Sequence, residues 1–144
     1  MKRIILTLTM ALVATGALYS QNTGPSQSDV YYVKITDPVN DGFKAGPQCK
    51  ISGEANIPSG YHLWVLCHRA DFPKWWAQSY PKINQGAWHA TVTVGENQDI
   101  GEDFEIIAIV VDNATDAQLK ASYGQGIDLP DTNYSALRVV HKIK

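Results

Sequence analysis

The sequence is short of positive charge. It has 12 Lys and Arg against 14 Asp and Glu, which gives a formal net charge of −2. The basic residues are scattered, and they form neither a cluster that would follow a phosphate backbone nor a polybasic segment for an anionic membrane. We therefore expect no nucleic-acid partner and no electrostatic binding to a membrane surface.

Motifs of the commoner enzyme chemistries are missing as well. The sequence contains no G-x-S-x-G elbow, P-loop, G-x-G-x-x-G or H-E-x-x-H. His68, Asp71 and Ser79 lie near one another along the chain, but such a triple arises by chance in a sequence of this length. We predict a protein that is not an enzyme, with no catalytic residue and no cofactor; a small secreted hydrolase is the alternative.

Metal-ligand spacing is also lacking. His62, His68, His89 and His141 have no His, Cys or Glu at the i+2 or i+4 spacing of a zinc motif. The acidic stretch GENQDIGED (95–103) lacks the order of an EF-hand loop, although its oxygens leave calcium binding open. We expect a solvated loop there and no metal site.

The first 20 residues have the pattern of a secretory signal peptide. Lys2 and Arg3 precede an uncharged apolar run at 4–18, and small residues then lead to Ser20. The run is shorter than the roughly 20 residues that a spanning helix needs. We predict cleavage after Ser20 and a secreted or periplasmic chain with no membrane span. The chain after cleavage has ten basic and fourteen acidic residues, which gives a formal net charge of −4.

The mature chain is expected to form one domain. Residues 21–29 are polar and turn-rich, which predicts a flexible leader before a domain at 30–144. Within that domain, apolar and polar residues alternate with period two between turn-rich segments, which is typical of an antiparallel β-sandwich. The predicted strands are 30–36, 49–57, 61–68, 88–94, 104–112 and 135–143.

Two of these strands, 61–68 and 104–112, are apolar on both faces. A sandwich strand normally shows one face to water, so we expect these two to be neighbours in a sheet whose outer face is covered. The candidates for the cover are a short helix near 116–123 and the segment 71–87.

The expected helix has recognisable ends. Thr115 and Gln118 have capping-box spacing, and Gly124 stands where a left-handed stop is wanted. The pattern predicts the only helix of the domain.

The segment DFPKWWAQSYP holds the candidate ligand-binding residues Trp75, Trp76 and Tyr80. In an extended segment the two tryptophans point to opposite sides, so one packs on the covered sheet and the other lies near the surface. An exposed ring stacks on a sugar or packs against a partner protein. A purely structural role for the segment stays open, whereas Trp64 and Trp88 are expected in the core.

Cys49 and Cys67 are the only cysteines, an even count in an exported chain. Cys49 begins one predicted strand and Cys67 ends the next, which places both at one end of the sandwich if the strands are antiparallel. A bridge closing a loop of this length is worth about 3 kcal/mol. We predict a disulfide, with two buried free thiols as the alternative.

The order of several short motifs resembles a known family. "ITDP", "ISGEA", "YHLWVL", "WW..QSYP", "GAWHATV" and "DFEIIAIVVD" follow one another at 35–112 as in uncharacterised secreted or membrane-tethered Ig-like modules of bacteria and archaea. The resemblance implies an all-β, Ig-like antiparallel sandwich of about seven strands. This chain has Ala77 where the family has proline, which predicts a different loop shape.

The expected function follows from export and fold. We predict a non-catalytic Ig-like module of the cell envelope with a binding or structural role, whose partner is a polysaccharide or an envelope protein. A carbohydrate-binding module that uses exposed aromatics at 75–80 is the alternative.

Overall fold

A computed structural model of the chain describes residues 30–144. The predicted signal peptide (1–20) and leader (21–29) lie outside the described residues. Within residues 30–144, no helix has the length and apolar character needed to cross a membrane.

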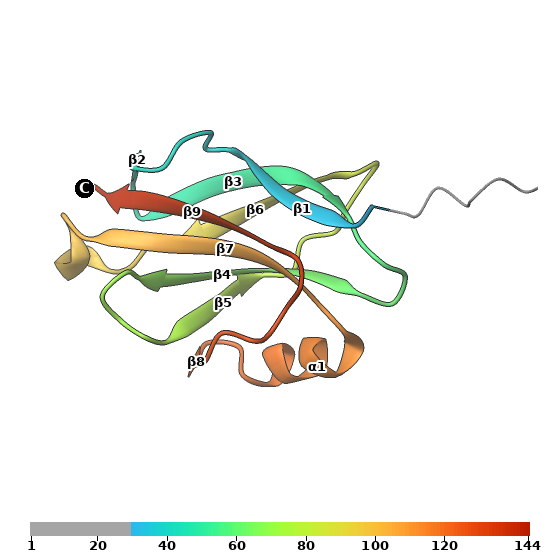
Figure 1. The fold of residues 1–144 in the computed structure, drawn as a ribbon. Helices are drawn as coiled ribbons and strands as arrows, with labels where there is room; N and C mark the ends of the chain where they lie inside the picture. The colour runs from blue at the N-terminus through green and yellow to red at the C-terminus, as the bar shows by residue number, and fades with distance from the viewer. Residues whose placement is uncertain (1–29) are drawn as a thin grey trace, which may run out of the picture.

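The described residues form two β-sheets, with one α-helix against the larger sheet (Figure 1). The smaller sheet has the strand order β1-β3-β6, and the larger has the order β2-β9-β7-β4-β5-β8. All neighbours are antiparallel except β2 and β9. In chain order the elements are β1 (Tyr32–Asp37), β2 (Phe43–Ala45), β3 (Gln48–Asn56), β4 (His62–Arg69), β5 (Trp75–Ser79), β6 (Ala87–Thr93), the 3-10 helix η1 (Asn97–Asp99), β7 (Asp103–Val111), α1 (Asn113–Ala121), β8 (Gly126–Ile127) and β9 (Ser135–Lys142).

The described residues therefore form an all-β sandwich of two sheets with one short α-helix, as the sequence predicted. The six expected strands match β1, β3, β4, β6, β7 and β9 within one or two residues at each end. The expected number of about seven strands is too low, because the described residues form nine. The three additional strands, β2, β5 and β8, have three, five and two residues, which is too short for a clear alternation in the sequence.

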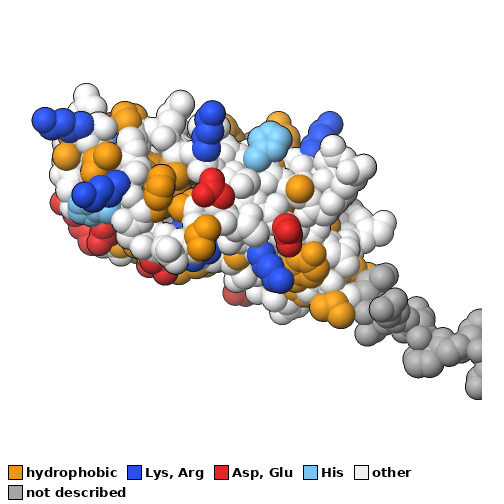
Figure 2. All heavy atoms as spheres, turned by 90° about the horizontal axis from the view of Figure 1, so that it is seen from above, with side chains coloured by type: hydrophobic (Ala, Val, Ile, Leu, Met, Phe, Trp, Pro, Cys, Tyr) orange, Lys and Arg blue, Asp and Glu red, His pale blue; other side chains and the backbone are white. Residues whose placement is uncertain are grey.

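The inner core lies between the sheets and is built by alternate residues of the strands. On β3, Cys49, Ile51 and Ala55 are buried, and their neighbours on the other face are polar. Gly53 leaves room for the Trp88 ring, since a Cβ atom there would lie 2.5 Å from the ring and 1.9 Å from the Lys34 carbonyl oxygen. The outer face of the smaller sheet carries lysine, acidic and histidine side chains (Figure 2).

A second core covers the outer face of the larger sheet. β4 and β7 are paired neighbours, as predicted. Their outward residues pack with Leu119 of α1 and with Ile127 of β8; the buried members are Trp64, Leu66, Trp75, Ala77, Ile107, Ile109, Val111 and Leu119. The helix is thus a cover, as expected, and it lies below the larger sheet in Figure 1.

The expectation that segment 71–87 also lies across this face is wrong. Residues Trp75–Ser79 form β5, which lies within the sheet and pairs with β4. Pairing satisfies the backbone polar groups of an extended segment beside a long strand. Trp75 and Ala77 then supply part of the outer core from within the sheet.

The helix begins earlier than its predicted capping box. Its N-cap is Asp112, whose Oδ1 accepts a hydrogen bond of 2.8 Å from the Thr115 backbone N–H. Thr115 therefore lies inside the helix rather than at its cap. Gly124 does adopt a left-handed φ of +82° just beyond the helix, in agreement with the predicted stop.

The predicted disulfide is not formed in this structure, where Cys49 and Cys67 are buried free thiols. The prediction treated their strands as an antiparallel pair. β3 and β4 belong to different sheets, and both thiols lie in the inner core between the sheets. Burial, with a smaller contribution from Cys49, raises the pKa of Cys67 to about 12.

Candidate functional site

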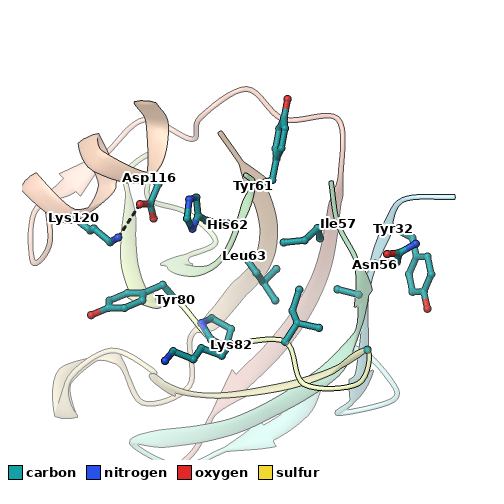
Figure 3. A pocket seen from close by; sticks show the side chains of 14 residues that line it. Tyr32, Asn56, Ile57, Tyr61, His62, Leu63, Tyr80, Lys82, Asp116 and Lys120 are labelled. Carbon is teal, nitrogen blue, oxygen red and sulfur yellow. Dashed lines mark hydrogen bonds and ion pairs between the residues drawn. The ribbon is translucent and has the colours of Figure 1, made fainter. Parts of the chain in front are cut away.

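Two clefts open on the surface beside β5. One has a volume of about 870 Å³ and lies between α1, the β3–β4 turn and the segment after β5; we call it the Tyr80 cleft (Figure 3). The other has a volume of about 610 Å³ and is lined by Trp76, Gln78 and the β6–β7 connection. We call it the Trp76 cleft.

Tyr80 projects into the Tyr80 cleft and packs against the buried ring of Trp64. Its ring centroid lies 5.0 Å from that of buried Trp64, and the Lys120 Nζ lies 5.5 Å from the Tyr80 centroid. The Tyr80 side chain is nevertheless 58 % exposed. Figure 3 shows Tyr80 and Lys82 near one another on one side of the cleft, with His62 and Asp116 on another.

Asp116 joins this cleft to the covered core. It is buried, and its Oδ1 accepts a hydrogen bond of 2.9 Å from Trp64 Nε1, while its Oδ2 accepts one of 2.8 Å from Lys120 Nζ. Burial by itself raises the pKa of the Asp116 carboxyl, but the hydrogen bonds from Lys120 and Trp64 outweigh it. The pKa therefore lies below its ordinary value, and the carboxylate neutralises Lys120.

The Trp76 cleft exists because the two sheets have unequal numbers of strands. The smaller sheet ends at β6, whereas the larger continues through β5 to β8. The side chains of β5 that face away from the outer core, Trp76 and Gln78, therefore extend past the edge of the smaller sheet. Gln78 Oε1 accepts a hydrogen bond of 3.0 Å from the Thr93 N–H, which ties β5 to the β6 edge.

Trp76 forms a pair of rings with Phe72 in this cleft. The two ring centroids are 5.6 Å apart with an interplanar angle of 29°. Trp76 is half-buried, and Phe72 is 44 % exposed. A Cβ atom at Gly126 would lie 3.0 Å from the Trp76 ring, so the glycine of β8 lets the indole lie close against that strand.

Polar side chains surround the ring pair. Arg69 pairs with Asp71 at 2.5 Å and with Asp99 at 3.1 Å, and Glu96 is exposed on the same side. Aromatic faces beside hydrogen-bonding groups offer a ligand both stacking and polar contacts.

His68 supports the turn that carries Phe72. Its Nδ1 lies 2.5 Å from the Phe72 carbonyl oxygen, its Nε2 lies 2.7 Å from Glu105 Oε2, and its ring stacks on Trp75 at 3.7 Å. A carbonyl and a carboxylate only accept hydrogen bonds, so both bonds form together when both ring nitrogens carry protons. The arrangement anchors the turn to β7.

The structure separates the three candidate ligand-binding residues. Trp75 is only 7 % exposed and packs in the outer core, so it is not accessible to a ligand. Trp76 points to the other side of β5, in agreement with the predicted opposite orientation of the two rings. Tyr80 lies in the other cleft.

Sequence reasoning missed three residues of the clefts. Phe72 stands four residues before Trp76, Lys120 lies in the last turn of α1, and Tyr123 follows the C-cap of that helix, Ser122. The aromatic content of the 72–80 segment signalled Phe72. Nothing local signalled that α1 ends beside β5, where the Tyr123 hydroxyl donates to the Gln78 carbonyl oxygen at 2.9 Å.

No catalytic or metal-binding constellation is seen among residues 30–144. His68 bonds to Phe72 and Glu105, and Asp71 pairs with Arg69, so these residues do not form a triad with Ser79. The described residues contain no group of three or more His, Cys, Asp or Glu that would hold a metal ion.

Comparisons with solved structures find several chains of low similarity, and two Ig-like domains are among them. The crystal structure of the RIG-5 IG1 homodimer has a TM-score of 0.36 and 11 % identity, over 78 % of this chain and 96 % of that chain. The structure of murine CRIg has a TM-score of 0.35 and 8 % identity, over 80 % and 99 %. No protein-family model matches the sequence, and no curated protein sequence is significantly similar to it.

Proposed function

We propose that the chain is an exported, non-catalytic Ig-like module of the cell envelope that binds carbohydrate in the Trp76 cleft. The observation that supports this most is the Trp76–Phe72 ring pair, which is accessible from a cleft although Trp76 belongs to the inward-facing side of its strand. A half-exposed indole held against a neighbouring strand offers a rigid apolar face, and rigid aromatic faces bind with little loss of conformational entropy.

A carbohydrate fits this site better than a flat protein surface. The rings lie in a concave site, and the donors and acceptors of Arg69, Gln78 and Glu96 lie beside them. Sugar rings have apolar faces and hydroxyl rims, so they meet both kinds of group at once. The signal-peptide pattern at 1–20 and the resemblance to secreted or membrane-tethered Ig-like modules support the proposed location.

The proposal is tested with the mature chain and a panel of soluble neutral and acidic polysaccharides, including xylan, a glucan, pectin and alginate. Isothermal titration calorimetry should detect binding to at least one of them. The Trp76→Ala variant should bind that polysaccharide at least about tenfold more weakly, because losing one buried aromatic contact costs more than about 1.4 kcal/mol.

The matched control is Phe43→Ala. Phe43 is 48 % exposed on β2, at the opposite edge of the larger sheet from β8. Its loss should leave the affinity unchanged. Equal binding by wild type and Trp76→Ala would show that the cleft is not the site, and binding to no member of the panel would reject carbohydrate as the ligand.

A further inference from the structure

The Trp76 cleft and the Tyr80 cleft adjoin along β5. Gln78 lines the first and Tyr80 the second, and these residues are two apart in one extended segment, which places them about 7 Å apart. At the C-terminal end of α1, Lys120 lines the Tyr80 cleft, and Tyr123, three residues later and just beyond the helix, lines the Trp76 cleft. The β5 segment and the C-terminal end of α1 thus each contribute residues to both clefts.

A polar contact of Tyr123 lies where the two clefts approach each other. The Tyr123 hydroxyl donates to the Gln78 carbonyl oxygen at 2.9 Å, and Tyr123 itself is 55 % exposed. Accessible rings therefore lie along the whole seam: Phe72 and Trp76 at one end, Tyr123 at the boundary and Tyr80 at the other end. From Trp76 to Tyr80 an extended chain covers about 13 Å, which is more than one sugar ring spans.

The two ends differ in charge. In the Tyr80 cleft, Asp116 neutralises Lys120, and Lys82 has no ion pair among residues 30–144. In the Trp76 cleft, Arg69 is held by Asp71 and Asp99, which leaves Glu96 as the exposed charge. The Tyr80 end thus favours an anionic group, whereas the Trp76 end disfavours one.

We propose that the ligand is a linear acidic polysaccharide that lies along β5 across both clefts. This inference rests on the proposed function and adds the shape and charge of the ligand. Sugar rings stack on Trp76 and Phe72 at one end, the chain crosses over Tyr123, and a carboxylate-bearing sugar stacks on Tyr80 beside the Lys82 ammonium. Lys82 and Tyr80 lie close together on the cleft wall in Figure 3, as this arrangement requires.

The other chemistry that fits a row of rings is a peptide in extended conformation. A peptide would be expected to add to the β5 edge through backbone hydrogen bonds. Residues 75 and 76 already pair with β8, and the Gln78 carbonyl oxygen already accepts the Tyr123 hydroxyl. The edge is therefore occupied where a peptide strand would bind, and the polysaccharide is the better fit.

The experiment compares chain lengths and variants of the mature protein. Galacturonic acid, digalacturonate, hexagalacturonate, hexameric alginate and the neutral cellohexaose are titrated by calorimetry. An acidic hexasaccharide should bind at least about tenfold tighter than its disaccharide and than cellohexaose. Tyr80→Ala and Lys82→Gln should each remove roughly tenfold from the affinity for the acidic hexasaccharide and leave that for the disaccharide unchanged.

Matched controls separate this inference from the proposed function. Lys44→Gln removes an exposed lysine on β2 and should change nothing. Trp76→Ala should weaken binding of short and long oligosaccharides alike. If Trp76→Ala weakens binding but Tyr80→Ala and Lys82→Gln do not, or if chain length and charge have no effect, the two-cleft inference is overturned while the proposed function stands. If no saccharide binds, both are rejected.

Discussion

Asp116 makes a buried polar contact between α1 and the larger sheet. Its two carboxylate oxygens serve different partners, the Trp64 indole N–H in the core and the Lys120 ammonium on the helix. A Trp64 ring that is fully buried needs an acceptor for its N–H, because water does not reach it. The same carboxylate sets the charge of the Tyr80 cleft by neutralising Lys120.

Removing this acceptor should destabilise the fold measurably. Asp116→Ala leaves the Trp64 N–H buried without a partner, which costs about 1–3 kcal/mol. Asp116→Asn should cost less, because an amide oxygen still accepts from the indole. Urea unfolding monitored by circular dichroism measures both. An Asp116→Asn variant as unstable as Asp116→Ala would mean that the ion pair with Lys120, rather than the Trp64 bond, is the stronger contact.

The same residue gives a pH dependence of known sign. The folded-state pKa of Asp116 is lowered, as is that of Asp112, where the backbone N–H of Thr115 donates to the carboxylate. A lowered pKa means stability that is complete above the unfolded value of 3.8 and is lost as the pH falls through the folded value. The free energy of unfolding should therefore fall below about pH 4, and less so in Asp116→Asn.

Cys67 gives a prediction about reactivity. With its pKa raised to about 12 by burial, the thiol is almost wholly protonated near neutral pH and is shielded from reagents. Iodoacetamide should leave both cysteines unmodified in the folded chain and should modify both after unfolding in urea without reductant. Two cysteines that resist alkylation in urea until a reductant is added would restore the disulfide predicted from the sequence.

The strands show how far the sequence patterns reach. Apolar patterns located every strand of six or more residues among residues 30–144, and the double-faced apolar character of 61–68 and 104–112 correctly indicated a covered sheet. The pattern did not locate β5, because its outer face is apolar and its other face carries an aromatic and an amide. It placed the helix start at Thr115 because Thr115 and Gln118 have the right spacing, whereas Asp112 supplies the N-cap bond.

The position of each tryptophan within its strand predicts a graded effect on stability. Trp64 and Trp88 are buried in the outer and inner cores, and their replacement by alanine should cost about 3–5 kcal/mol. Trp76 lies in the open cleft, and Trp76→Ala should cost under about 1 kcal/mol, as surface substitutions do. Chemical unfolding of the three variants gives the order. A loss at Trp76 as large as at Trp88 would mean that the cleft rings are part of the core.

At the scale of the whole molecule, the Trp76 cleft arises from the mismatch between a three-stranded and a six-stranded sheet. The sequence correctly predicted the local part of this arrangement, namely that Trp75 and Trp76 point to opposite sides of an extended segment. The sequence did not predict the unequal number of strands in the two sheets. That number depends on pairings between distant segments, such as β5 with β8 and β3 with β6. The separation of Trp76 and Tyr80 into adjoining clefts follows from the same non-local pairing.

The most direct test of the proposed site observes the four indole N–H signals by two-dimensional ¹H–¹⁵N NMR. Each signal is assigned from its single Trp→Phe variant, and the chain is titrated with the polysaccharide that binds it. The Trp76 signal should shift with saturation, while those of buried Trp75 and Trp88 should remain within their linewidths. Shifts at the buried indoles, with a stationary Trp76 signal, would contradict carbohydrate binding in the cleft between the unequal sheets.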